Sequence, residues 1–129
     1  MSLPVAIRNT LLTNEALVNY TGNRIYNMRF PQDDTSEAVA FNVSNNVNEA
    51  MYAGTSVLLS PEVRLTLRAK TLAKLEDMRS TIHDQFNVAE VAVNEYGAVQ
   101  CEVNDLGAEY DDALDVYHHY TTLNLKMRT

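Results

Sequence analysis

Several residue types are scarce in this 129-residue sequence: it has no tryptophan, one cysteine, four glycines and three prolines. A single cysteine, Cys101, excludes an internal disulfide and fits a reducing compartment. The few glycines form no Gly-x-Gly-x-x-Gly motif or other phosphate-binding loop. No apolar run approaches the roughly 20 residues of a membrane helix, and no basic region precedes an apolar stretch at the start. We therefore expect neither a membrane span nor a signal peptide.

What remains is an ordinary globular composition, with 46% hydrophobic and 21% charged residues. These fractions are too apolar for a disordered chain, and the length matches that of one typical domain. We find no internal repeat, linker or low-complexity tract. The sequence therefore predicts a single domain over residues 1–129.

The net charge of −7 is unevenly distributed along the chain. Residues 64–79 contain five bases and two acids, whereas residues 84–115 contain nine acids and no Lys or Arg. This asymmetry has two interpretations: complementary faces for self-association, or a solvated acidic loop that keeps the protein soluble. A nucleic-acid-binding protein normally carries the opposite balance of charge, so we expect no specific nucleic-acid binding.

Apolar residues at helical spacing predict a helix near residues 3–12 and a short second helix that Asn14 caps and Gly22 ends. A long amphipathic helix is predicted from residue 70 or 71 to 86, with one apolar stripe. That stripe consists of Leu72, Leu75, Met78, Ile82 and Phe86.

Alternating apolar residues predict strands at 25–30, 38–43, 61–69, 88–93, 98–103 and 117–127. In the third of these strands, Val63, Leu65 and Leu67 form the buried face, and Arg64, Thr66 and Arg68 form a basic outer face. Residues 44–60 show no consistent period and predict a long apolar connection, and residues 104–115 predict an acidic loop. The predicted fold is α+β: one mixed, mainly antiparallel β-sheet with an N-terminal helix and one long amphipathic helix packed on one face.

Residues suited to catalysis or metal binding are present but not grouped. His118 and His119 are neighbours that point to opposite faces of a strand, and His83 has no ligand at the adjacent helical positions. The acidic segment lacks the Asp-x-Asp-x-Asp-Gly calcium pattern, and Cys101 lies at an inward strand position. We therefore expect no enzyme activity, no metal and no cofactor.

Three parts of the chain carry a family resemblance. They are Ile7-Arg8-x-x-Leu11-Leu12 with Ala16-Leu17-Val18, the segment Gly22-Asn23-Arg24-Ile25-Tyr26, and the strand from Val63 that runs directly into the helix ending at Phe86. With the closing segment Leu106-Gly107-Ala108-Glu109-Tyr110-Asp111 and a last strand, the sequence resembles the tail-completion (head–tail joining, tail-terminator) proteins of long-tailed bacteriophages. It departs from them at Ala38-Val39, where the family often has a proline and an aromatic residue, and at Arg68-Ala69, where it often has an aromatic residue.

The resemblance implies a structural virion protein that forms a hexameric ring on the head-proximal end of the tail tube. Such a ring stops tube growth and contacts the head-completion or connector protein, while DNA passes through without specific binding. The implied location is the virion neck, after synthesis in the host cytoplasm.

Charge and pattern add two hypotheses about the surfaces of such a ring. The first is a subunit or partner interface formed by Met51, Tyr52, Val57, Leu58, Leu59, Arg64, Arg68 and Lys74. The second is an acidic segment that faces the lumen or an adjacent subunit, formed by Asp105, Glu109, Asp111, Asp112 and Asp115. Two alternatives stay open: another connector or tube subunit of the same particle, and a small ligand-binding or enzymatic α+β domain.

Overall fold

The computed structural model describes residues 3–31, 35–44, 47–50, 57–59, 61–87, 91–93 and 97–128. The helices are α1 (Leu3–Leu12), α2 (Glu15–Thr21) and α3 (Leu72–Phe86). The strands are β1 (Ile25–Asn27), β2 (Ala38–Ser44), β3 (Val47–Ala50), β4 (Val57–Leu59), β5 (Glu62–Ala69), β6 (Val91–Val93), β7 (Gly97–Asp111) and β8 (Val116–Arg128). Among the helices so described, none is long and apolar enough to cross a membrane.

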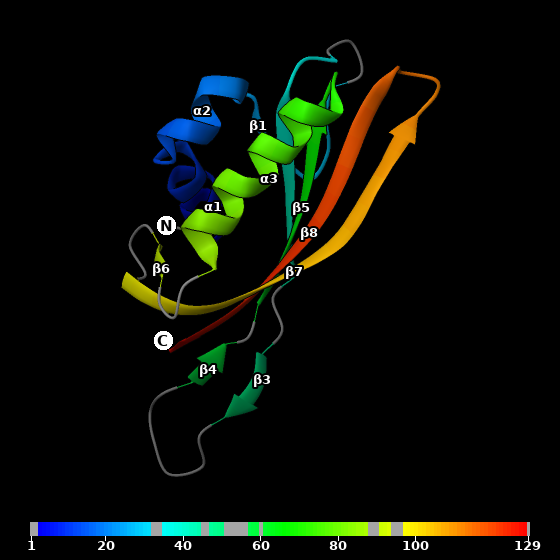
Figure 1. Ribbon diagram of the computed structural model, residues 1–129. Coiled ribbons are helices and arrows are strands. Elements are labelled where there is room, and N and C mark those ends of the chain that lie inside the picture. The colour runs from blue at the N-terminus through cyan, green and yellow to red at the C-terminus, as the bar shows by residue number, and fades with distance from the viewer. Residues whose placement is uncertain are drawn as a thin grey trace.

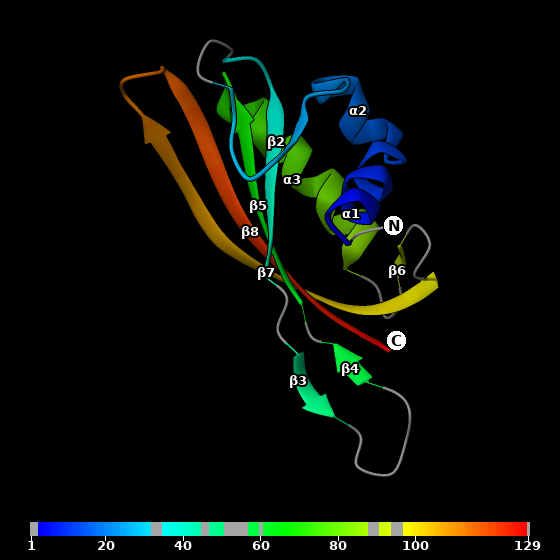
Figure 2. The same cartoon turned by 180° about the vertical axis from the view of Figure 1, so that it is seen from behind.

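The main sheet follows the order β1-β2-β5-β8-β7. β1 runs parallel to β2, and the other pairs are antiparallel. Asn124 of β8 pairs with Glu62 of β5 and with Glu102 of β7, so β8 lies between these strands. The helices lie on one side of this curved sheet (Figures 1 and 2). The predicted α+β fold with a mixed, mainly antiparallel sheet is confirmed.

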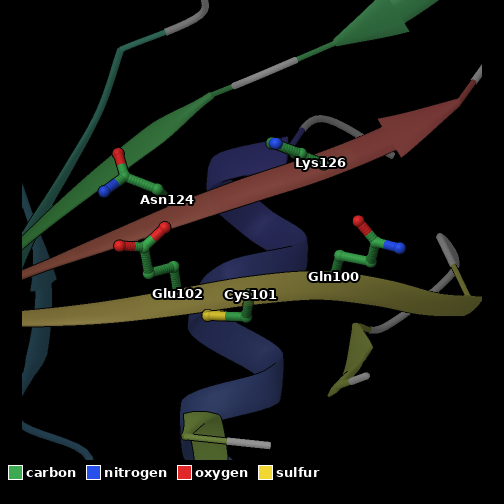
Figure 3. A pocket seen from close by; sticks show the side chains of 5 residues that line it. All are labelled: Gln100, Cys101, Glu102, Asn124 and Lys126. Atoms are coloured by element: carbon green, nitrogen blue, oxygen red, sulfur yellow. The ribbon is translucent and has the colours of Figure 1, made fainter. Parts of the chain in front are cut away.

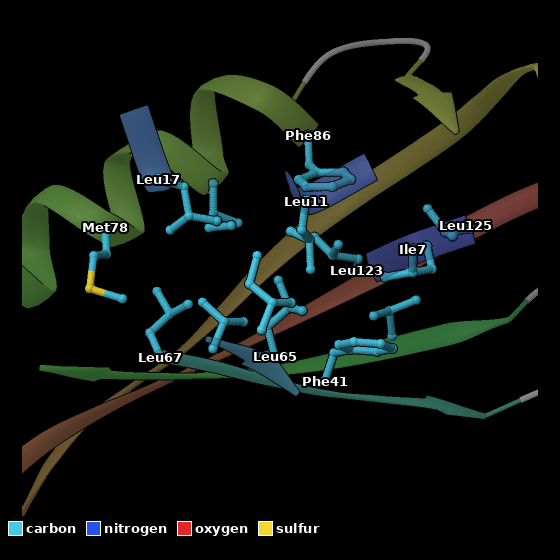
Figure 4. Close-up of a cluster of buried hydrophobic side chains, with 14 of the residues drawn as sticks. Ile7, Leu11, Leu17, Phe41, Leu65, Leu67, Met78, Phe86, Leu123 and Leu125 are labelled. Atoms are coloured by element: carbon cyan, nitrogen blue, oxygen red, sulfur yellow. The ribbon is translucent and has the colours of Figure 1, made fainter. Parts of the chain in front are cut away.

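The hydrophobic core fills the space between the sheet and the helices (Figure 4). Leu75, Met78, Ile82 and Phe86 of α3 are fully buried against the sheet, as the predicted stripe requires. Each such side chain contributes roughly 1.5–3 kcal/mol by leaving water. The prediction is wrong for Leu72, which is 50% exposed, because it is the first residue of the helix.

Asn14 and Gly22 bound α2 as predicted. The Asn14 side chain accepts a hydrogen bond from the Leu17 amide, which the helix itself leaves without a partner. Its amide nitrogen also donates to the Thr81 carbonyl oxygen and to Gln85 Oε1, both at 3.0 Å, so the cap joins α2 to α3. Gly22 ends the helix at a φ of 58°.

Two predicted boundaries are wrong. β1 ends at Asn27, because Met28 has a φ of 80° that a strand cannot accommodate. Residues 104–111 belong to β7 and not to an acidic loop, so the turn is confined to residues 112–115. A register shift between Asp105 and Gly107 interrupts the alternation along β7, which is why the pattern did not indicate a strand.

Within the predicted connection 44–60, the described residues 47–50 and 57–59 are more regular than predicted. β3 and β4 pair antiparallel, and Leu58 and Leu59 of β4 pair with the end of β8. The two strands project from the end of the sheet that lies farthest from the β7–β8 turn (Figure 1). We call β3 and β4 the β-arm. Met51 and Tyr52 lie outside the described residues.

Candidate functional site

No described helix covers the sheet face opposite α1, α2 and α3 (Figures 1 and 2). Strand pairing places Arg64 beside Thr122 and Thr66 beside Tyr120 on this face, because directly paired residues point to the same side. Their neighbours Val63, Leu65 and Leu67 point into the core. We call the side of the sheet that carries Arg64, Thr66, Tyr120 and Thr122 the helix-free face.

One part of the helix-free face is covered by the chain itself. Residues 28–31 leave β1 and bring Phe30 onto Arg68, whose side chain also donates to the Ser36 carbonyl oxygen at 3.0 Å. Arg68 is only 1% exposed, and Ala38 and Ala40 beside it are buried. The prediction that Arg68 belongs to an exposed basic surface is therefore wrong.

Next to this covered part lies an open hollow of about 570 Å³, which we call the Arg64 hollow. Its lining residues are Glu62, Arg64, Leu65, Thr66, Leu106, Tyr120, Thr121 and Thr122. The Arg64 side chain is 69% exposed and pairs with Glu62 at 2.8 Å, and Leu106 is 68% exposed. The hollow thus combines an apolar wall with an accessible guanidinium group at its rim.

Tyr120 is held in the floor of the hollow by a 2.6 Å hydrogen bond to Glu109 Oε1. Desolvation and this carboxylate raise the pKa of Tyr120 to about 12. The phenol is therefore a fixed, neutral donor at physiological pH. Such a side chain suits protein contact, because it offers a large apolar surface with little loss of conformational freedom.

A second, smaller hollow of about 220 Å³ lies on β7 and β8 (Figure 3). Its lining residues are Gln100, Cys101, Glu102, Asn124 and Lys126. Burial, and then the nearby Glu102 carboxylate, raise the pKa of the Cys101 thiol to about 12. A thiol so protonated is a poor nucleophile, so the geometry favours a packing role for Cys101.

The predicted basic residues do not form one surface. Arg64 lies on the helix-free face, whereas Lys74 lies on α3 and pairs with Glu37 at 3.7 Å. With Arg68 buried, Arg64 is the member of the predicted basic group that the helix-free face presents. Lys74 follows Arg64 by ten residues in the sequence, but the two residues lie on different elements, β5 and α3.

Asp105 is likewise separated from the other acidic residues. It lies before the β7 bulge and points toward α3, where it contacts His83, Arg79 Nη1 at 3.6 Å and His119 Nε2 at 3.1 Å. Thr121 donates to the same carboxylate at 3.1 Å. Desolvation raises the pKa of Asp105, but hydrogen bonds from His119, His83 and Thr121 outweigh it and lower the pKa overall.

This convergence of two histidines on one carboxylate was missed in the sequence. The sequence placed His83 on a helix and His119 on a strand. The strand predicted at 98–103 ended before Asp105, so nothing indicated that Asp105 faces the two histidines. The Nε2 atoms of both imidazoles approach Asp105, so the carboxylate bridges them. Within the described residues, no group of three or more His, Cys, Asp or Glu side chains is arranged to hold a metal ion.

The remaining acids gather at the β7–β8 turn, which we call the acidic turn: Glu109, Asp111, Asp112 and Asp115. The Asp111 carboxylate accepts from the amides of Ala113 at 3.0 Å and Leu114 at 3.3 Å, and Tyr110 donates to Asp115. The hydrogen bond to Asp115, together with nearby carboxylates, raises the pKa of Tyr110 to about 12. These bonds fix the turn and leave Leu114 44% exposed between Asp112 and Asp115.

None of the four acidic-turn residues forms an ion pair with a Lys or Arg among the described residues. The turn therefore presents a compact negative charge with an apolar centre. It lies at the opposite end of the molecule from the β-arm (Figure 1). One chain thus carries distinct surfaces at its two ends and on its helix-free face.

Comparison with known proteins finds structural likeness only. No protein-family model and no curated protein matches the sequence. Among solved structures, the fold matches a chain of a structure described as the virion of a native gene transfer agent particle, with a TM-score of 0.63 and 12% sequence identity. The match covers 99% of this chain and 96% of that chain. At this identity the likeness establishes a shared fold.

Proposed function

We propose that this chain is a structural protein of a phage-like virion, and that it closes as a ring on the head-proximal end of a tail tube. The observation that carries the proposal is the fold match with a virion chain over nearly the full length of both chains. The sequence resemblance to tail-completion proteins supports the same role. The proposed location is the neck of the particle, after synthesis in the host cytoplasm.

The surfaces of the domain suit a ring. A cyclic assembly needs two different, complementary patches on each subunit, and the acidic turn and the Arg64 hollow differ in charge and shape. The β-arm adds a third surface, at the end of the molecule that is distant from the acidic turn (Figure 1). We assign the β-arm, with Val57, Leu58 and Leu59, to contact with the tube protein or the head-completion protein.

The negative charge of the chain suits a ring through which DNA passes better than a protein that binds DNA. The net charge is −7, and the acidic turn forms no ion pair with a Lys or Arg among the residues that the structure describes. Carboxylates near a lumen repel phosphates, so DNA passes without specific binding. The proposed role is architectural and includes no catalysis, metal or cofactor.

The test is the length of tail tubes assembled in the presence of the purified protein, measured by electron microscopy. A terminator is expected to give tubes of limited length with a ring at one end. A tube subunit is expected to extend filaments on its own, and a connector subunit to form rings that do not limit tube growth. Unlimited tubes with no ring would contradict the proposal.

A variant in the β-arm sharpens the test. Replacing Leu58 and Leu59 by Asp is expected to abolish tube capping, because two charges enter the proposed contact. The matched control is Leu72→Asp, which places a charge at an exposed position on α3. Equal capping by both variants would remove the β-arm from the proposed interface.

A further inference from the structure

We propose that neighbouring copies of this chain join by seating the acidic turn of one subunit in the Arg64 hollow of the next. Leu114 is the apolar centre of this contact, and Asp112 and Asp115 flank it. The inference rests on the proposed ring and names the residues that connect its subunits.

The acidic turn has the properties of an inserting element. Its backbone amides are bonded to Asp111 and its Asp115 side chain to Tyr110, so little freedom is lost on docking. The ring of Tyr110 packs against Tyr117 with centroids 5.0 Å apart, which braces the base of the turn. Leu114 remains exposed despite this order.

The Arg64 hollow has the complementary properties. Leu106 and Tyr120 provide an apolar surface for Leu114, and Arg64 provides a positive charge at the rim. The pair of Arg64 with Glu62 is exposed to solvent, and exposed ion pairs contribute little to stability. Arg64 can therefore exchange Glu62 for an aspartate of the incoming turn at small cost.

Other charges near the hollow define the orientation of the contact. Lys126 lies farther along β8 and adds positive charge, whereas Glu62, Glu102 and the Glu109 carboxylate bonded to Tyr120 add negative charge. The affinity of the turn for the hollow therefore depends on the apolar contact of Leu114. The charges determine the orientation in which the turn docks.

The tip of the turn cannot reach the hollow of its own chain, although Glu109 at the base of the turn bonds Tyr120 there. Val116, at the base of the turn, and Thr122, in the lining of the hollow, lie on the same strand. Six residues of extended strand separate them by about 20 Å. The occupant is therefore a second copy, and because each copy carries both elements the contact repeats head to tail, as a ring requires.

Disulfide trapping between two singly substituted proteins tests this contact. In a Cys101→Ser background, one protein carries Leu114→Cys and the other Leu106→Cys, both at exposed positions. We expect the mixed pair to cross-link at least tenfold faster than a control pair of Leu72→Cys with Leu106→Cys. Equal rates for the two pairs would overturn the proposal.

Charge reversal gives a second, independent readout on the same cross-linking reaction. Arg64→Glu in the Leu106→Cys protein is expected to slow the mixed reaction severalfold, and Asp112→Arg in its partner to restore it. A lack of restoration would contradict the pairing of Arg64 with the acidic turn. Circular dichroism and urea unfolding verify that each variant is folded.

The outcome is separable from the proposed function. Rings that form without this cross-link would retain the virion role and refute the contact. A specific cross-link in a protein that does not cap tail tubes would retain the contact and refute the terminator role.

Discussion

The ring of Phe30 lies over the guanidinium group of Arg68, with 4.3 Å between Arg68 Cζ and the ring centroid. His118 stacks on the same ring at a centroid distance of 5.9 Å, and Tyr26 meets its edge at 6.4 Å. These residues come from β1, β5, β8 and the segment after β1. Their contacts explain how a charged side chain at a predicted outer position becomes buried.

Phe30→Ala is expected to destabilise the fold by about 2 kcal/mol, because it removes packing and the cation–π contact and exposes Arg68. Urea unfolding followed by circular dichroism measures the change in the free energy of unfolding. Met28→Ala, at a highly exposed position in the same segment, is the control and is expected to have little effect. Equal stability of the two variants would show that Phe30 does not anchor this segment.

Asp105→Ala is expected to cost about 2 kcal/mol, because it removes hydrogen bonds that join α3 to β7 and β8. His119 Nδ1 is buried with no hydrogen-bond partner in the described structure, so losing Asp105 leaves neither nitrogen of this ring bonded. Asp105→Asn keeps a bonding side chain and is expected to cost less. Thermal unfolding compares the two, and a smaller loss for Ala than for Asn would contradict this account.

The lowered pKa of Asp105 predicts an acid-dependent loss of stability. The folded state favours the carboxylate, so this stabilisation is present above the unfolded pKa of about 4 and is lost as pH falls through the lower folded value. Unfolding free energies of the wild type and Asp105→Asn between pH 7 and pH 2 measure it. The difference between the two proteins is expected to shrink below pH 4, and a constant difference would assign the effect elsewhere.

Gly107→Ala is expected to destabilise the β7 bulge by about 1–2 kcal/mol. Gly107 has a φ of 110°, which a residue with a Cβ rarely adopts, although no atom lies within 4 Å of the added Cβ. The cost is therefore conformational and not steric. Leu106→Ala, at the neighbouring exposed position, is the control in urea unfolding, and equal effects would contradict a special role for the backbone at Gly107.

The Cys101 thiol is expected to react with a thiol reagent at pH 8 on the order of a hundredfold more slowly in the folded than in the urea-unfolded protein. Burial raises its pKa to about 12, so the folded state holds the proton. The stabilisation from this thiol is full below the unfolded pKa and is lost as pH rises toward the folded value. Comparable rates in both states would show that Cys101 is accessible as a thiolate.

Local sequence signals predicted the elements whose pattern is regular. The stripe from Leu75 to Phe86 identified α3, and the alternation of Val63, Leu65 and Leu67 identified β5. Asn14 and Gly22 located the ends of α2 because capping depends on neighbouring residues alone. The acidic half of β7 was missed because the bulge breaks its alternation, and the end of β1 was missed because Met28 adopts a positive φ without being glycine.

The α+β class, the order of most elements, the core-facing residues and the uneven charge were predictable, because each follows from residue type and short-range spacing. Which charged side chains are available at the surface depends on long-range contacts. Arg68 is buried because Phe30 returns over it, and Asp105 contacts His83 and His119, which are 22 and 14 residues away. Such contacts depend on strand register and on a single bulge, which no local pattern encodes.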